Sequence, residues 1–305
     1  MAETSDDLVT LVRRDSFLPA AQRNFPIPTI LQIADEETVN GIARVLKSLQ
    51  MGFYEEDADS TMTVGISRYD LDRYAMWNAV RRIDLLDTDG TEVQLNQITR
   101  EQIYDYSTTG QGRPEAFMFE DKQVRFFPIP DAAYTMRQAI YRRPGQLVPV
   151  ASAAQVLTAV GTTVTYTASK PSTFGAATIH DFYRGTSPFR RIGTAITATG
   201  SPGATQQSFA SASVSLLQAG DWVCVRGQTI FPGVPCDLIP HLKDLVVASI
   251  ASTQMDAAAY QLRREKIMSN AREEMTAPGG RTSGQPKRIS ISAGRVGLRR
   301  GSVAR

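Results

Sequence analysis

The sequence contains very few of the residues that usually build catalytic sites. Its 305 residues include only two histidines, His180 and His241. His180 and Asp181 are adjacent in a predicted strand, where successive side chains point to opposite faces, so they are badly placed to act as a base and its orienting partner. His241 falls in the first turn of a predicted helix, where a surface or capping role is typical. We therefore expect no catalytic residues and no enzyme activity.

Cysteine is equally scarce, and the common ligand-binding motifs are missing. Cys224 and Cys236 are the only two cysteines, too few for a disulfide framework, and they lack the CxxC spacing of a zinc site. The sequence has no P-loop and no nucleophile-elbow motif, and Gly110-Gln111-Gly112 lacks the third glycine of a dinucleotide fingerprint. We expect free thiols in a reducing compartment, no metal and no cofactor.

Two acidic motifs have an ordinary structural explanation. Asp87-Thr88-Asp89-Gly90 resembles the start of a calcium loop, but Asp-Gly between two alternating runs is typical of a hairpin turn. The run from Glu55 to Asp59 is a possible cation site, and we interpret it instead as a solvated loop.

Long hydrophobic runs are also missing. The first residues, MAETSDDLVTLVRRD, lack the apolar core of a signal peptide. The apolar stretches are far shorter than the roughly 18 residues that a membrane span needs. We expect a soluble, cytosolic product with no membrane partner.

Charge is distributed unevenly along the chain. The last 29 residues carry seven basic and no acidic side chains, whereas residues 1–276 have a net charge of −5. Three interpretations of this extended basic arm remain open: a solubility tail, a nucleic-acid-binding arm, or a docking arm that orders on a protein partner. The alternation of polar and apolar residues at 288–292 suits strand addition to a sheet edge, and the acidic body disfavours nucleic acid, so we favour docking. The docking residues would be Arg281, Lys287, Arg288, Ile289, Ile291, Arg295, Arg299, Arg300 and Arg305.

The patterning predicts an α+β fold. Residues 5–12 and 29–54 have helical spacing, the second with a possible break near Asp35 or Gly41. Alternating runs predict strands at 61–66, 77–87, 91–95, 115–119, 123–127 and 134–142, with a short helix at 99–106 anchored by Ile103 and Tyr104.

Composition changes after Pro144. Residues 151–235 contain only seven charged side chains and are rich in Thr, Ser, Ala and Gly. Short predicted strands at 162–167, 176–183, 194–199, 213–217 and 222–226 indicate an inserted all-β domain. We therefore predict a core of helices and β-hairpins at 1–149 and 236–276, a β domain at 150–235, and the arm at 277–305.

Helical spacing returns at Asp237 and predicts one long C-terminal helix reaching Met275 or Thr276. Such a helix would be about 60 Å long, too long for a compact domain to cover. Residues that recur every three or four positions form a stripe along this helix, and the side chains in the middle of the stripe are small. The stripe predicts contact with another subunit through Leu242, Val246, Ser249, Thr253, Ala257 and Tyr260.

The order of these segments resembles the head-to-tail adaptor, or connector, proteins of tailed bacteriophages. The resemblance covers about half of the chain. It rests on RRIDLLDTDGTEV at 81–93, RPEAFMFEDKQVRFFPIPDAAYTMRQAIYRRP at 113–144 and DLIPHLKDLVVASIAS at 237–252. Three short motifs of the family pattern occur together here: Gly112-Arg113-Pro114, Pro128-Ile129-Pro130 and Tyr141-Arg142-Arg143-Pro144. The β insert departs from the minimal family pattern.

The resemblance implies a structural virion protein without catalysis. It would form a dodecameric ring beneath the portal, with the arm on the portal and a nozzle, tube or terminator protein below. Viral DNA would pass through the ring without sequence-specific binding, and assembly would take place in the host cytoplasm. The alternatives are a phage decoration protein or adhesin, suggested by the Thr/Ser-rich insert, and a virion hydrolase using paired carboxylates.

Overall fold

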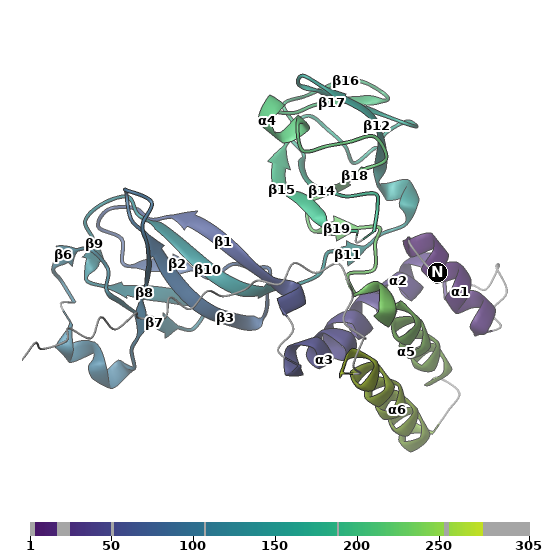
Figure 1. Cartoon of the computed structure of the whole chain (residues 1–305), viewed down its shortest axis with the longest axis horizontal. Helices are drawn as coiled ribbons and strands as arrows, with labels where there is room; N and C mark the ends of the chain where they lie inside the picture. Colours follow the sequence, from purple (N-terminus) through teal and green to yellow (C-terminus); the bar gives the residue numbers. More distant parts are fainter. Residues whose placement is uncertain are drawn as a thin grey trace, which may run out of the picture.

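The chain folds into three units that meet at a narrow junction (Figure 1). The computed structural model describes residues 4–16, 25–49, 52–106, 108–187, 189–252 and 256–276, without the side chains of 77–79. We call residues 4–49 and 236–276 the helical unit, residues 52–143 the charge-rich lobe and residues 144–235 the charge-poor lobe. About a third of the chain is helix and a third is strand, which confirms the predicted mixture of helix and sheet.

The helical unit packs its helices around one apolar core. Its elements are α1 (Ser5–Asp15), α2 (Ile27–Glu37), the π-helical turn η1 (Thr38–Ile42), α3 (Ala43–Ser48), α5 (Ile239–Ala251) and α6 (Ala257–Thr276). Thr4 caps α1 in a capping box with Asp7. The core is formed by Leu8, Val12, Ile30, Leu31, Ile42, Leu46, Leu242, Leu245 and Val246.

The predicted helix at 29–54 ends earlier, at Ser48, and is interrupted at η1, close to the break expected near Gly41. A Cβ atom at Gly41 would lie 3.2 Å from Cδ1 of Leu245. The glycine therefore lets α5 approach this turn closely.

The prediction of one long C-terminal helix is wrong, because α5 and α6 are separate helices that pack against each other as a hairpin. Nε2 of His241 in α5 lies 2.5 Å from Oε2 of Glu274 in α6, whereas 33 residues of straight helix would separate them by about 50 Å. Near the bend, Ser252 donates its hydroxyl to the Ser249 carbonyl, and the Asp256 carbonyl accepts the first bond of the next helix, from Tyr260 N–H. Folding back buries Ala271 and Met275 in the chain's own core, so no second subunit is needed to cover an over-long helix.

The charge-rich lobe contains two four-stranded sheets. One has the order β1 (Glu55–Thr61), β10 (Thr135–Arg142), β3 (Ala75–Leu86), β4 (Glu92–Gln94). The other has the order β2 (Arg68–Asp70), β8 (Gln123–Phe127), β7 (Ala116–Glu120), β5 (Asn96–Gln97), and β6 (Gln111–Gly112) pairs with β9 (Ile129–Pro130). Alternate residues of β10 are buried, as expected for a sheet with one face on the core. That core includes Met62, Ile83, Leu85, Phe117, Phe126 and Met136.

Three predictions for this lobe are wrong. The acidic run at 55–59 is not a loop: it forms β1, paired in regular register with β10, whereas residues 62–66, predicted as strand, are irregular. Tyr104 is not an anchor of the short helix, here the 3-10 helix η3 (Arg100–Asp105). Ile103 packs inward, and Tyr104 is 92% exposed.

The charge-poor lobe is built on a seven-stranded sheet. The strand order is β15 (Arg191–Thr197), β14 (Ile179–Tyr183), β18 (Trp222–Val225), β12 (Ala154–Val160), β13 (Thr163–Tyr166), β17 (Gln206–Ser208), β16 (Gly200–Gly203). Its core contains Val156, Val164, Tyr166, Phe182, Phe209 and Val223. The strand predicted at 213–217 is wrong, because Ser211–Val214 form the short helix α4. At the base, β11 (Gln146–Leu147) and β19 (Gln228–Thr229) make a parallel pair, flanked in sequence by the 3-10 turns η4 (Val150–Ser152) and η5 (Cys236–Leu238).

Candidate interaction surfaces

His180 and Cys224, which could act as a base and a nucleophile, have structural roles here. His180 is fully buried on β14 between the rings of Phe174 and Phe209, and burial lowers its pKa to about 4. Asp181 points to the other face and accepts the backbone N–H groups of Ala195 and Gly227, each at 2.9 Å. Burial also raises the pKa of the Cys224 thiol to about 12, so this thiol is unreactive. Among the described residues, no three His, Cys, Asp or Glu side chains gather as a metal site would require.

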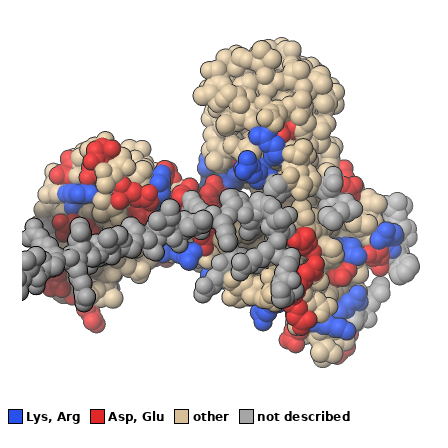
Figure 2. All heavy atoms as spheres, viewed as in Figure 1, with Lys and Arg blue, Asp and Glu red and all other residues tan. Residues whose placement is uncertain are grey.

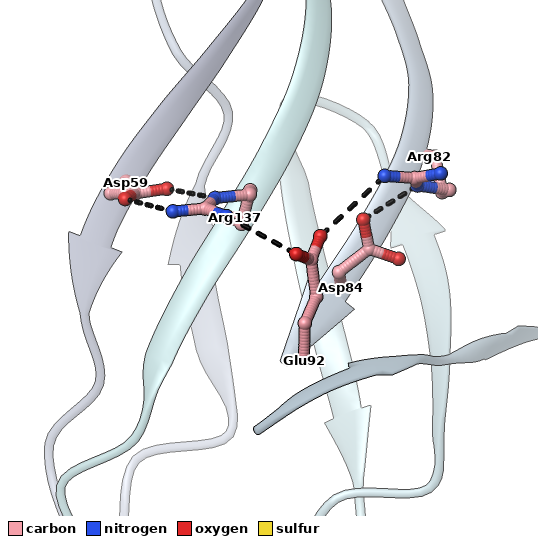
Figure 3. A network of polar contacts seen from close by, with 5 residues as sticks. All are labelled: Asp59, Arg82, Asp84, Glu92 and Arg137. Atoms are coloured by element: carbon pink, nitrogen blue, oxygen red, sulfur yellow. Dashed lines mark hydrogen bonds and ion pairs between the residues drawn. The ribbon is translucent and has the colours of Figure 1, made fainter. Parts of the chain in front are cut away.

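Arginines neutralise the acidic side chains of β1. Glu55 pairs with Arg81, and Glu56 pairs with Arg142 at 3.1 Å and with Arg191 of the charge-poor lobe. Figure 3 shows that Asp59 forms two bonds with Arg137, at 2.8 and 2.9 Å, and that Arg137 also reaches Glu92. Glu92 in turn contacts Arg82, which pairs with the buried Asp84. These carboxylates form a row of ion pairs with arginines across the sheet. Ion pairing with arginine side chains is a different role from the binding of a metal cation.

The junction ties the helical unit firmly to the base of the charge-poor lobe. Ser5 donates its hydroxyl to the Val148 carbonyl at 2.7 Å and its N–H to Ile230 at 2.6 Å. Both carboxylate oxygens of Asp35 on α2 accept the N–H of Leu147 on β11, at 2.9 and 3.1 Å. Burial of Asp35 raises its pKa to about 7.

Arginines from both lobes gather around Tyr74 at the same junction. The guanidinium carbons of Arg73, Arg142 and Arg226 lie 4.9, 4.9 and 5.1 Å from the Tyr74 ring centre. Figure 2 shows Lys and Arg atoms gathered at the base of the charge-poor lobe, whose distal part carries almost no charge on the visible face. Sequence patterns do not indicate this cluster, because its members come from three separate segments.

The six residues of the predicted subunit-interface stripe do not form one surface. Leu242 and Val246 are fully buried in the core of their own chain, Ser249 and Tyr260 are partly buried, and Ala257 is exposed. Thr253 lies outside the described residues. The predicted stripe requires a single helix, whereas its residues lie on two separate helices, α5 and α6.

Helix α6 nevertheless has a large uncovered face. Only Ala271 and Met275 of its twenty residues are buried, and Leu262 is 71% exposed. Its partly buried residues Tyr260 and Arg264 contact Glu37. A small groove of about 240 Å³ lies between α3 and α6, lined by Val45, Met268 and polar neighbours. The predicted docking arm, 277–305, lies outside the described residues.

A comparison with protein families matches residues 4–166 to the SU10 adaptor protein family. The chain belongs to this family. The match covers more than half of the chain and confirms the resemblance to phage head-to-tail adaptors. It includes α1, α2 and the charge-rich lobe, and it runs past Pro144 to the end of β13, while α5 and α6 lie beyond it. No curated protein matches the chain.

The family makes this adaptor a structural component of a phage particle, with portal and tail proteins as partners. That role points away from catalysis. In the part of the chain that the structure describes, the helices are too short or too polar to span a bilayer.

Proposed function

We propose that the chain assembles into a closed ring, most simply a dodecamer, beneath the portal of a tailed phage. The ring joins the capsid to the next tail component, a nozzle, tube or terminator protein, around the channel through which DNA passes. The observation that carries this proposal is the match to the adaptor family along a chain of three units extended from a junction. It would be a virion protein, assembled in the host cytoplasm.

The charge distribution supports a division of labour within the ring. Residues 1–276 carry −5 and residues 277–305 carry +7. A net-acidic body does not grip a passing polyanion, which suits a channel that DNA must traverse without sequence-specific binding. The basic arm is the portal-docking element, in which Lys287–Ser292 can add as a strand and the four last arginines can form ion pairs.

The uncovered face of α6 is the part of the predicted interface that remains available to a second copy. Ala257 is exposed at the start of this helix. Ala257→Leu should weaken packing between copies by about 1–3 kcal/mol per contact if the surface is tightly packed. Normal assembly of this variant on portals would place the interface elsewhere.

Deleting residues 281–305 tests the docking arm. The truncated protein should keep the unfolding transition of the full chain, because the core lies within 4–276, and it should no longer bind portal. Replacing Arg295, Arg299, Arg300 and Arg305 by serine should weaken binding most at low salt, since ion pairs are screened as salt rises. Unchanged portal affinity of the truncated protein would refute the docking role, and steeply salt-dependent binding to free DNA would favour a nucleic-acid arm.

A decoration protein or adhesin is the second candidate. It is favoured by exposed apolar side chains on β12 of the charge-poor lobe, Leu157 at 51% and Val160 at 75%. Mass measurement with portal separates the two: a closed ring supports the adaptor, and a monomer or trimer that ignores portal supports the alternative.

A further inference from the structure

The free end of the charge-rich lobe presents an aromatic residue flanked by acids. The 3-10 helix η3 packs Ile103 and Tyr106 into a small apolar cluster on one side. Because side chains three residues apart align on a 3-10 helix, Glu101 and Tyr104 share an outward face, with Asp105 beside them. Tyr104 is 92% exposed, more than any other large apolar side chain among the described residues, and both acids are exposed. An exposed tyrosine of this kind is a common anchor in protein interfaces.

The Tyr74 junction presents the opposite charge. Among the described residues, Arg73 and Arg226 form no ion pair, and Glu56 is shared between Arg142 and Arg191. Arg143 donates its backbone N–H to the Tyr74 carbonyl and interacts electrostatically with the buried Asp35. The Nε atoms of Arg142 and Arg226 are buried and, within the described part of the chain, have no hydrogen-bond partner. Arg73 and Arg143 are exposed. Positive charge therefore exceeds its local partners on a surface that a second molecule can reach.

We propose that these two surfaces bind each other between neighbouring copies: the Glu101/Tyr104/Asp105 tip of one chain docks on the Tyr74 arginine cluster of the next. The two carboxylates supply the missing charge, and the Tyr104 ring stacks on an exposed guanidinium, as Tyr74 already does within one chain. This inference rests on the proposed ring and names residues that would close it.

The positions of the two surfaces require such a contact to be heterologous. In Figure 1 the charge-rich lobe extends away from the junction, and the short blue helix η3 lies at its free end. The tip therefore cannot reach the arginine cluster of its own chain without unfolding the lobe. A contact between different surfaces on successive copies propagates in one direction, and it closes into a ring when the rotation between copies divides a full turn evenly.

Charge reversal with rescue tests the proposal. Glu101→Arg with Asp105→Arg, and separately Arg73→Glu with Arg143→Glu, should each raise the protein concentration needed for half-maximal assembly on portal by about tenfold or more. Combining the reversed tip with the reversed cluster in one chain should restore assembly, because both members of the pair change sign. Asp70→Arg, an exposed acid on β2, is the matched control and should assemble as the unmodified chain does.

Cross-linking gives a readout that does not depend on portal affinity. Tyr104→Cys in one preparation and Arg73→Cys in another should form a mixed disulfide dimer on the assembled ring, and neither should do so alone. If the unmodified chain forms rings and both charge-reversed variants assemble normally, the proposed contact is refuted but the proposed ring is not. If the unmodified chain forms no ring with portal, the proposed function fails instead. A Tyr104→Ala ring that closes normally but loses a tail protein would assign the tip to that protein and overturn the proposal.

Discussion

The two β lobes have the same length and very different charge. Residues 52–143 hold 27 charged side chains in 92 residues, and residues 144–235 hold seven in 92. The charge-rich lobe has 16 acidic and 11 basic groups, and Figure 3 shows one network of ion pairs among them. The charge-poor lobe has only two acids, Asp181 and Asp221, and both are buried.

This difference shows two ways of using a carboxylate. On the surface of the charge-rich lobe, Asp59 is 44% exposed and Glu92 is 42% exposed, so water screens their pairs with arginine. In the charge-poor lobe, each of the two buried acids accepts two backbone N–H groups, and Asp221 also pairs with Arg184. We therefore expect each of the few charges of the charge-poor lobe to contribute strongly to folding stability. Each of the many charges of the charge-rich lobe should contribute little.

The largest expected effect comes from Asp221→Ala. Asp221 accepts Arg184 Nη1 at 2.9 Å and the N–H groups of Gly185 and Gln218 at 3.0 and 2.8 Å. Removing one partner of a buried pair costs about 3–5 kcal/mol, because the other is left without compensation. Equilibrium unfolding in urea should show this loss. Asp221→Asn keeps the shape and one acceptor and should lose less, and an equal loss in both variants would mean that charge alone is decisive.

His180 should make the charge-poor lobe sensitive to acid. Its pKa falls to about 4 in the folded chain because burial disfavours the imidazolium, whereas an unfolded histidine titrates near 6.5. The unfolded state therefore binds more protons below pH 6.5, and stability should decline from there towards pH 4, by about 2–3 kcal/mol. His180→Gln should flatten this part of the unfolding profile. A profile with the same slope in the variant would assign the acid sensitivity to other groups.

The local pattern of apolar and polar residues predicted many of the helices and strands. The features that it did not predict depend on contacts between residues far apart in the sequence. The Asp-Gly hairpin, the alternating strand at 134–142 and an interruption of the helix near Asp35 or Gly41 were predictable because each depends on neighbouring residues. The bend between α5 and α6 was not, because Ser252 and Asp256 fit a helix as well as a cap when residue spacing is the only guide. Tyr104 looked like an anchor because a 3-10 helix aligns different residues from an α-helix. The Tyr74 cluster needed three distant segments to meet.

Asp35 belongs to α2, but we expect it to affect stability strongly, as the buried acids of the charge-poor lobe do. Burial raises its pKa to about 7, so the unfolded chain ionises this group at lower pH than the folded chain does. Stability should therefore fall as pH rises from about 4 to 7, by about 1–2 kcal/mol for a partly buried group. Asp35→Asn can still accept the Leu147 N–H and should remove this dependence. A dependence that persists in the variant would exclude Asp35 as its source.

The smallest expected effect comes from Arg137→Gln, although Arg137 contacts two acids. Its bonds to Asp59 and Glu92 lie at the surface, where an ion pair contributes about 0.2–1 kcal/mol and salt weakens it. Its stem lies on β10 between core positions, and glutamine preserves part of that packing. Unfolding measured at low and at molar salt should show a small difference between variant and unmodified chain that shrinks as salt increases. A loss above about 2 kcal/mol that ignores salt would show that packing or geometry, and not charge, stabilises the sheet at this residue, and the contrast between the two lobes would then be one of composition alone.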